Sequence, residues 1–222
     1  MTTKAQHIVL LGDSIFDNAA YVGGGPDVVA QVRALLPSGG RATLLAVDGA
    51  VVGDVERQVS QLPGDATMLV LSVGGNDALG EAHLLRQPVR TVAEGVALLA
   101  KAQRAFDGRY SGILDRLQAT GIPAAGCTIY DANFPPPEGP IITSALSLFN
   151  DVITRALFSR GMPLIDLRLI CNQPADYANP IEPSVQGGAK IACAIAQAAA
   201  AGRHGRSTVW AGRPADAEEP AP

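Results

Sequence analysis

The chain has 222 residues, of which 47% are hydrophobic and 17% are charged, and its formal net charge is −4. This apolar content suffices for the core of one globular domain and excludes a disordered chain, which needs low hydrophobicity and high net charge. Mild acidity without a basic stripe argues against binding of nucleic acid. Because no apolar run reaches the roughly 18 residues of a membrane span and the N-terminus lacks a signal-peptide pattern, we expect a cytoplasmic protein without a membrane partner.

Short apolar runs rich in branched residues alternate with longer segments of helical periodicity. This alternation is typical of a parallel sheet that is buried on both faces. Strands are predicted at His7–Leu11, Thr43–Val47, Met68–Val73, Ala124–Ile129 and Pro163–Leu167. Helices are predicted at Pro26–Leu36, Val89–Phe106, Ile142–Arg160 and Pro183–Ala201. The sequence therefore predicts an α/β fold, a three-layer α/β/α sandwich with a five-stranded parallel sheet, flavodoxin-like in its broad class.

We expect one domain over residues 1–201 and a flexible tail over 202–222, because the tail mixes Gly, Arg, Pro, Ala and Glu without periodicity. Docking of Trp210 onto the domain is the alternative for the tail. The cysteines match no zinc or disulfide spacing, so each is expected to be a small buried hydrophobic residue: Cys127, Cys171 and Cys193. The glycines at 23–25 lack the Lys and Ser/Thr of a phosphate-binding loop.

Small and polar residues follow the first three predicted strands. They read Gly12-Asp13-Ser14, then Asp48-Gly49-Ala50, then Gly75-Asn76-Asp77. In an open parallel sheet, ligands bind beyond the carboxyl ends of the strands. Each segment alone is typical of a turn, and Asp13 and Asp77 are expected to fix their loops. The occurrence of all three in this order at one edge of the sheet is more specific and indicates an active site.

Together with residues 182–192, these segments resemble the SGNH hydrolases, also called the GDSL family of esterases and lipases. The resemblance extends over roughly residues 6–200. It implies hydrolysis of a small-molecule ester through the nucleophile Ser14, without a cofactor or a metal. It also implies an oxyanion site formed by the backbone N–H groups of Ser14 and Gly49 and by the side-chain amide of Asn76. Loss of one such donor costs roughly 3–4 kcal/mol of transition-state stabilisation.

The last family segment departs from this pattern. Where the family has Asp-x-x-His, residues 179–182 read Asn-Pro-Ile-Glu. Asn with an ionised Glu carries the same charge as an ionised Asp with a neutral His, and an amide can donate to a carboxylate. We therefore expect Glu182 to replace the histidine base, with Asn179 orienting it. The three histidines offer no easy substitute, since they lie at the opposite edge, after the third strand and in the tail: His7, His83 and His204.

Two other interpretations stay open. In the first, the chain is an inactive descendant of the family that binds an acyl or carbohydrate ligand. In the second, it is a hydrolase with a different base, Asp131, Asp176 or His83. Glu182 also has a structural interpretation, because Pro183 at the first helical position would place it near a helix N-terminus, where the macrodipole lowers its pKa. As a working base, Glu182 predicts an acidic limb at about pH 4–5.5 in the activity profile.

Two expectations concern the surroundings of this site. Tyr130, Asn133 and Phe134, which precede three prolines, are expected to form a stiff lip over the pocket. Lys190, on the last helix, is expected to be solvated. The sequence determines neither the ester that is hydrolysed nor the oligomeric state.

Overall fold

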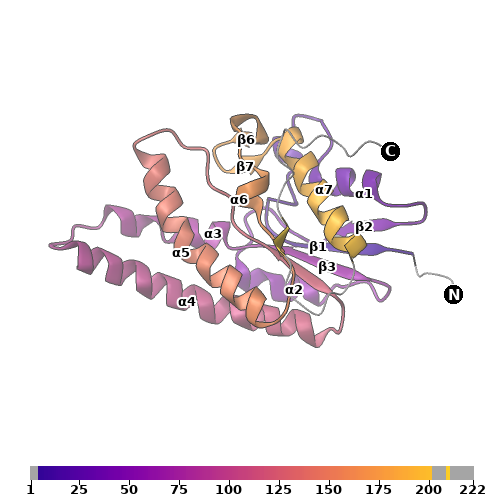
Figure 1. Ribbon diagram of the computed structural model, residues 1–222, viewed down its shortest axis with the longest axis horizontal. Coiled ribbons are helices and arrows are strands. Elements are labelled where there is room, and N and C mark those ends of the chain that lie inside the picture. The colour runs from indigo at the N-terminus through magenta and orange to yellow at the C-terminus, as the bar shows by residue number, and fades with distance from the viewer. Residues whose placement is uncertain (1–4, 202–208, 211–222) are drawn as a thin grey trace.

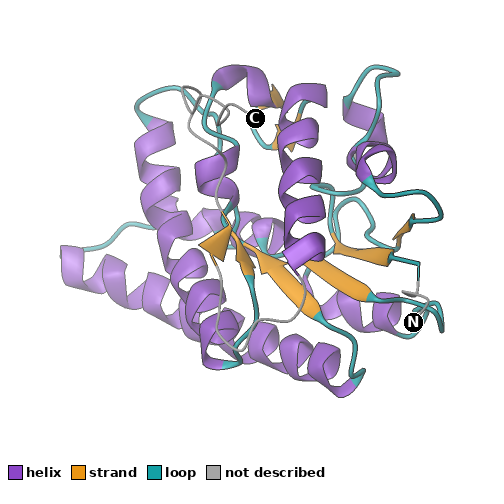
Figure 2. Ribbon diagram, turned by 45° about the vertical axis from the view of Figure 1, so that its right-hand side comes forward, coloured by secondary structure: helices purple, strands orange, loops and turns teal. Residues whose placement is uncertain are grey.

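The computed structural model describes residues 5–201 and 209–210. Its main sheet is parallel, with the strand order β2-β1-β3-β4-β5-β8, and helices cover it on both sides (Figure 2). The strands are β1 (His7–Gly12), β2 (Arg41–Leu44), β3 (Met68–Ser72), β4 (Ala124–Cys127), β5 (Leu164–Ile165) and β8 (Val209–Trp210). The predicted α/β fold with five parallel strands is confirmed. The added strand β8 belongs to the predicted tail, whose other residues lie outside the described part of the chain.

The helices connect these strands in the order expected for a doubly wound sheet. The α-helices are α1 (Val28–Leu35), α2 (Val55–Val59), α3 (Gly75–Gly80), α4 (Val92–Ala119), α5 (Glu138–Ser159), α6 (Leu167–Ile170) and α7 (Val185–Ala201). Short 3-10 helices are η1 (Ala19–Tyr21), η2 (Val52–Asp54), η3 (Ala82–Arg86) and η4 (Pro174–Asp176). A two-stranded antiparallel ribbon, β6 (Tyr177–Asn179) with β7 (Glu182–Pro183), precedes α7.

The start of α7 corrects a prediction. The helix begins at Val185 rather than at Pro183, which lies in β7 together with Glu182. The Oγ atom of Ser184 accepts a hydrogen bond from the backbone N–H of Gly187 at 3.2 Å, so Ser184 caps the helix. Glu182 is therefore a strand residue, and the predicted macrodipole effect on its carboxyl group does not apply.

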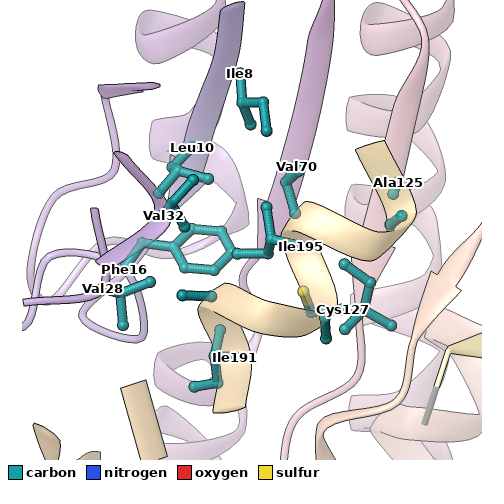
Figure 3. Close-up of a cluster of buried hydrophobic side chains, with 14 of the residues drawn as sticks. Ile8, Leu10, Phe16, Val28, Val32, Val70, Ala125, Cys127, Ile191 and Ile195 are labelled. Carbon is teal, nitrogen blue, oxygen red and sulfur yellow. The ribbon is translucent and has the colours of Figure 1, made fainter. Parts of the chain in front are cut away.

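The sheet divides the core into two parts, as the alternation of side chains along β1 requires. Ile8 and Leu10 point toward α1, α6 and α7 (Figure 3). Val9 and Leu11 belong to the opposite part, which packs against α2, α4 and α5. Burial on both faces accounts for the continuous apolar sequence of this strand.

Helices α4 and α5 run side by side over one face of the sheet (Figure 1). By length and composition α5 is apolar enough to cross a membrane, and its buried apolar side chains pack into the same core as those of α4. Two of the cysteines are buried as predicted, Cys127 and Cys171. Cys193 is exposed on α7, which corrects that part of the prediction.

Candidate active site

Ser14 lies in a tight turn directly after β1. The turn requires glycine at position 12, because the backbone φ there is +123° and a Cβ atom would lie 1.7 Å from the carbonyl oxygen of Ser72. The N–H of Asp13 donates to this same carbonyl at 3.1 Å. The carboxylate of Asp13 accepts from the N–H of Ile15 at 3.2 Å, which confirms its predicted role in the turn. These contacts fix the backbone on both sides of the serine.

Gln58 on α2 makes two hydrogen bonds to the backbone of Gly12 at the end of β1, a contact that the sequence did not predict. Its Oε1 atom accepts from the N–H of Gly12 at 2.7 Å, and its Nε2 atom donates to the carbonyl of Gly12 at 2.8 Å. A single glutamine on a short helix carries no pattern from which such a role could be inferred.

The hydroxyl of Ser14 donates a hydrogen bond to the carboxyl group of Glu182. The Oγ–Oε1 distance is 3.0 Å, and both side chains are buried. The second carboxyl oxygen, Oε2, is also buried and has no hydrogen-bond partner among the described residues. Burial raises the pKa of Glu182 to about 7, the charge of Asp48 adds to the rise, and the Ser14 bond opposes it. Glu182 can therefore exchange a proton near neutral pH.

A second carboxyl group, that of Asp13, lies buried beside this pair. Burial raises the pKa of Asp13 to about 8, the bond from Ile15 opposes the rise, and the charges of Glu182 and Asp77 add to it. At neutral pH, Asp13 is therefore mostly protonated. The site thus avoids two adjacent negative charges without needing an opposite charge.

Hydrogen bonds to the backbone hold the segment that carries Glu182. The Nδ2 atom of Asn18 donates to the carbonyl of Pro183 at 3.2 Å, and the hydroxyl of Tyr130 donates to the carbonyl of Ile181 at 2.6 Å. Tyr130, expected in a stiff lip over the pocket, is buried beneath this segment, and it lines the cavity described below together with Phe134. This role of Asn18 was not predicted, because its position four residues after Ser14 is the only feature of the sequence that places it near the site.

The predicted orienting hydrogen bond from the side chain of Asn179 to Glu182 is wrong. Asn179 is exposed, and its Oδ1 atom accepts from the N–H of Ile181 at 2.9 Å. The two residues pair across the ribbon, but the register of β6 is irregular between Tyr177 and Asn179. Such an irregularity re-aims side chains, and the local bond to Ile181 is typical of asparagine in a turn.

The other predicted bases lie in different surroundings. The ring nitrogens of His7 each lie 2.8 Å from a side chain of the opposite edge, Asp65 and Thr43. His83 is exposed, with Nδ1 3.1 Å from the carbonyl of Gly80. The side chains of Asp131 and Asp176 make no hydrogen bond to Ser14, and His204 lies outside the described residues.

The three predicted oxyanion donors lie at the ends of β1, β2 and β3. The Nδ2 atom of Asn76 donates to the carbonyl of Ala50 at 3.0 Å, which leaves its second hydrogen available. Gly49, next to Ala50, has a φ of +80°. Among the described residues, the N–H groups of Ser14 and Gly49 donate no hydrogen bond. Asp77 accepts from the N–H of Val52 at 2.9 Å and thus fixes its loop, as predicted.

A cavity of about 170 Å³ opens beside these residues. Its polar lining includes Ser14, Asn76 and Glu182, with Asp13 and Ser72 beside them, whereas Gly49 does not line it. Most of the other lining side chains are apolar and come from α3, η3, α4, α5 and the loop after β4. The site therefore combines a buried hydroxyl–carboxyl pair with an apolar chamber.

The three-layer fold, with these polar residues at the ends of its strands, is that of the SGNH hydrolases. Residues 10–190 match the model of the GDSL-like Lipase/Acylhydrolase family. The chain belongs to this family, which makes it a hydrolase of the esterase or lipase type.

Solved structures show the same fold. An extracellular lipase from Streptomyces rimosus has a TM-score of 0.63 at 18% identity, covering 84% of this chain and 96% of its own. A catalytic mutant of an acetylxylan esterase from Geobacillus stearothermophilus has a TM-score of 0.61 at 17% identity, covering 93% and 99%. An alpha/beta hydrolase from the metagenome of Lake Arreo has a TM-score of 0.63 at 19% identity, covering 91% and 99%. No curated protein sequence matches the chain.

Proposed function

We propose that this protein is a serine esterase in which Ser14 is the nucleophile and Glu182 is the general base. The observation that carries the proposal is the hydrogen bond of 3.0 Å from Ser14 Oγ to Glu182 Oε1 in a buried site. A base works best when its pKa lies near the operating pH, and burial raises the pKa of Glu182 to about 7. Glu182 is therefore a stronger base than an ordinary carboxylate.

In the acylation step, Ser14 Oγ attacks the ester carbonyl carbon while its proton passes to Glu182 Oε1. The electron pair of the carbonyl π bond moves to the oxygen, and the N–H groups of Ser14 and Gly49 and the amide of Asn76 stabilise this charge. The intermediate collapses, the bond to the alcohol oxygen breaks, and the leaving alcohol takes the proton from Glu182. An acyl–Ser14 ester remains.

In the deacylation step, water attacks the acyl carbon and gives its proton to Glu182. Collapse of the second intermediate releases the carboxylic acid and returns the proton to Ser14 Oγ. Asn18 and Tyr130 hold the backbone on either side of Glu182, so the base keeps its position without a third acidic residue. The proton on Asp13 keeps the site at a single negative charge.

Covalent labelling tests this proposal, because a fluorophosphonate reacts with an activated serine and not with an unassisted one. We expect labelling of the wild type on Ser14, and none of the Ser14→Ala variant at equal folded content by circular dichroism. Ser147→Ala, at an exposed serine on α5, is the matched control and should label normally. An unlabelled wild type would favour the inactive ligand-binding alternative, and equal labelling of Ser14→Ala would place the nucleophile elsewhere. The cytoplasmic location and the absence of a cofactor stay predictions.

A further inference from the structure

The cavity beside Ser14 has two chemically different ends. Its polar end holds the reacting groups, and its other end is lined by residues of α4 and α5, the two long helices that run side by side in Figure 1. Most side chains that line this second end are aliphatic or aromatic, among them Leu85, Leu99, Ala102, Ala145, Leu146 and Phe149, and the lining also includes the partly buried Glu81. Apolar surroundings of this kind exclude a hydroxylated or charged group, whose burial without partners is costly.

The proposed mechanism determines which half of the ester enters this cavity. The alcohol oxygen takes its proton from Glu182 as it leaves, so the alcohol must depart on the Glu182 side. Beyond Glu182 the surroundings are polar and exposed: Tyr21 donates to Asp48 at 2.7 Å, and Asp48 donates its N–H to Asp17 at 2.9 Å. The acyl half is left to face the apolar end.

We propose that the cavity is an acyl-binding site for an unbranched aliphatic chain of about six carbons, an inference that rests on the proposed function. A dry cavity of roughly 150 Å³ takes a ligand of the size of benzene, and this cavity has about 170 Å³. Leu79 and Leu85, both lining residues, are 53% and 38% exposed and mark where the cavity opens to solvent. Carbons beyond the sixth therefore reach solvent and add little binding.

A series of p-nitrophenyl esters with acetyl, butyryl, hexanoyl, octanoyl and benzoyl groups tests the assignment. Each methylene that is buried in the transition state is worth about fourfold in kcat/KM. We expect a rise of about 10²-fold from acetate to hexanoate and a plateau at octanoate. Equal rates for acetate and hexanoate, or a preference for benzoate, would overturn the assignment of an unbranched chain.

A substitution that fills the cavity provides a second test. Ala145→Phe, on α5, should lower the ratio of hexanoate to acetate activity at least tenfold, because the added ring occupies the acyl site. Ser144→Phe adds the same ring at an exposed neighbouring position that does not line the cavity, and it should leave the ratio and the activity unchanged. An unchanged ratio in folded Ala145→Phe would contradict the acyl site.

A binding measurement separates this inference from the proposed function. Hexanamide is uncharged and avoids repulsion by Glu182, so its binding to Ser14→Ala by calorimetry should be at least tenfold tighter than that of acetamide. The Ala145→Phe change should remove this preference. Binding of hexanamide without any ester hydrolysis would support the acyl site and contradict the catalytic proposal. Hydrolysis without a preference between hexanamide and acetamide would do the reverse.

Discussion

Asp176 and Glu182 are buried carboxyl groups of the same short segment, and their surroundings shift their pKa values in opposite directions. Asp176 accepts from the Nζ atom of Lys190 at 2.8 Å and from three further donors at 3.0 Å: Gln186 Nε2 and the N–H groups of Asn172 and Gln173. Burial alone would raise the pKa of Asp176, but these donors outweigh it and hold the pKa below its usual range.

Among the described residues, Glu182 has one donor, the hydroxyl of Ser14, and burial therefore prevails. The difference shows that the number of donors, rather than burial itself, separates a structural carboxylate from one that can take up a proton. Asp176 ties the segment before β7 to α7, and Glu182 keeps an oxygen without a partner at the cavity. Five predictions test this contrast.

The largest effect is expected from Glu182→Gln. The substitution keeps the size of the side chain but removes the base, so kcat/KM for a small activated ester should fall by about 10²–10⁴-fold. Near pH 4, where the folded carboxyl group is protonated, the free energy of unfolding in urea should change by less than about 1 kcal/mol, because among the described residues the carboxyl group has one hydrogen bond to lose. Full activity of this variant would show that the base lies elsewhere.

Asp176→Asn should lower the stability of the protein and leave its activity largely unchanged. The amide cannot accept from all four donors, and Lys190 loses its counter-charge. Since the side chain of Lys190 is one-third exposed and can turn to water, we expect a loss of about 1–3 kcal/mol in the free energy of unfolding. Activity of the folded variant should stay within about fivefold of the wild type. A loss of activity without a loss of stability would contradict the structural role.

The pH profile should show an acidic limb in kcat/KM near pH 7, with about tenfold lower values one unit below it. Glu182 must be ionised to act, and burial raises its pKa to about 7, so the structure moves the expected limb above the pH of about 4–5.5 that an ordinary carboxylate predicts. The limb should persist in Asp176→Asn and vanish in the residual activity of Glu182→Gln. A wild-type limb at or below pH 5.5 would show that Glu182 is not perturbed.

Stability should follow the same contrast. The folded state retains the proton of Glu182 up to about pH 7, whereas the ordinary value is 4.5, so this group lowers the free energy of unfolding as the pH rises between these values. Asp176 acts in the opposite sense, because its stabilising contribution is present above its ordinary pKa and is lost as the pH falls through its lowered pKa. Urea titrations of Glu182→Gln and Asp176→Asn across pH separate the two contributions.

Asn179→Ala should have the smallest effect. Its amide contacts the backbone of Ile181 rather than Glu182, so kcat/KM should change by less than about twofold. A tenfold loss would restore the orienting role that the sequence predicts for Asn179.

Local pattern was sufficient for the layers of this fold. The branched apolar runs predicted the strands because a parallel strand buried on both faces needs apolar residues at every position. The start of α7 was missed because Pro183 is equally compatible with a first helical turn and with an edge strand. Lys190 was expected to be solvated, since nothing near it in the sequence indicates that it reaches the buried Asp176.

By itself, the sequence determined which chemical groups end the strands and in what order, so Ser14, Gly49, Asn76 and Glu182 could be named as candidates. Only the tertiary structure decided which of these groups meet. The side chains of Ser14 and Glu182 are 168 residues apart in the chain and form one hydrogen bond, whereas the side chain of Asn179, three residues from Glu182, bonds to Ile181 instead of to that carboxyl group. The pKa of each carboxyl group depends on its burial and on donors contributed by distant elements. Neither this burial nor these donors exist until the chain is folded.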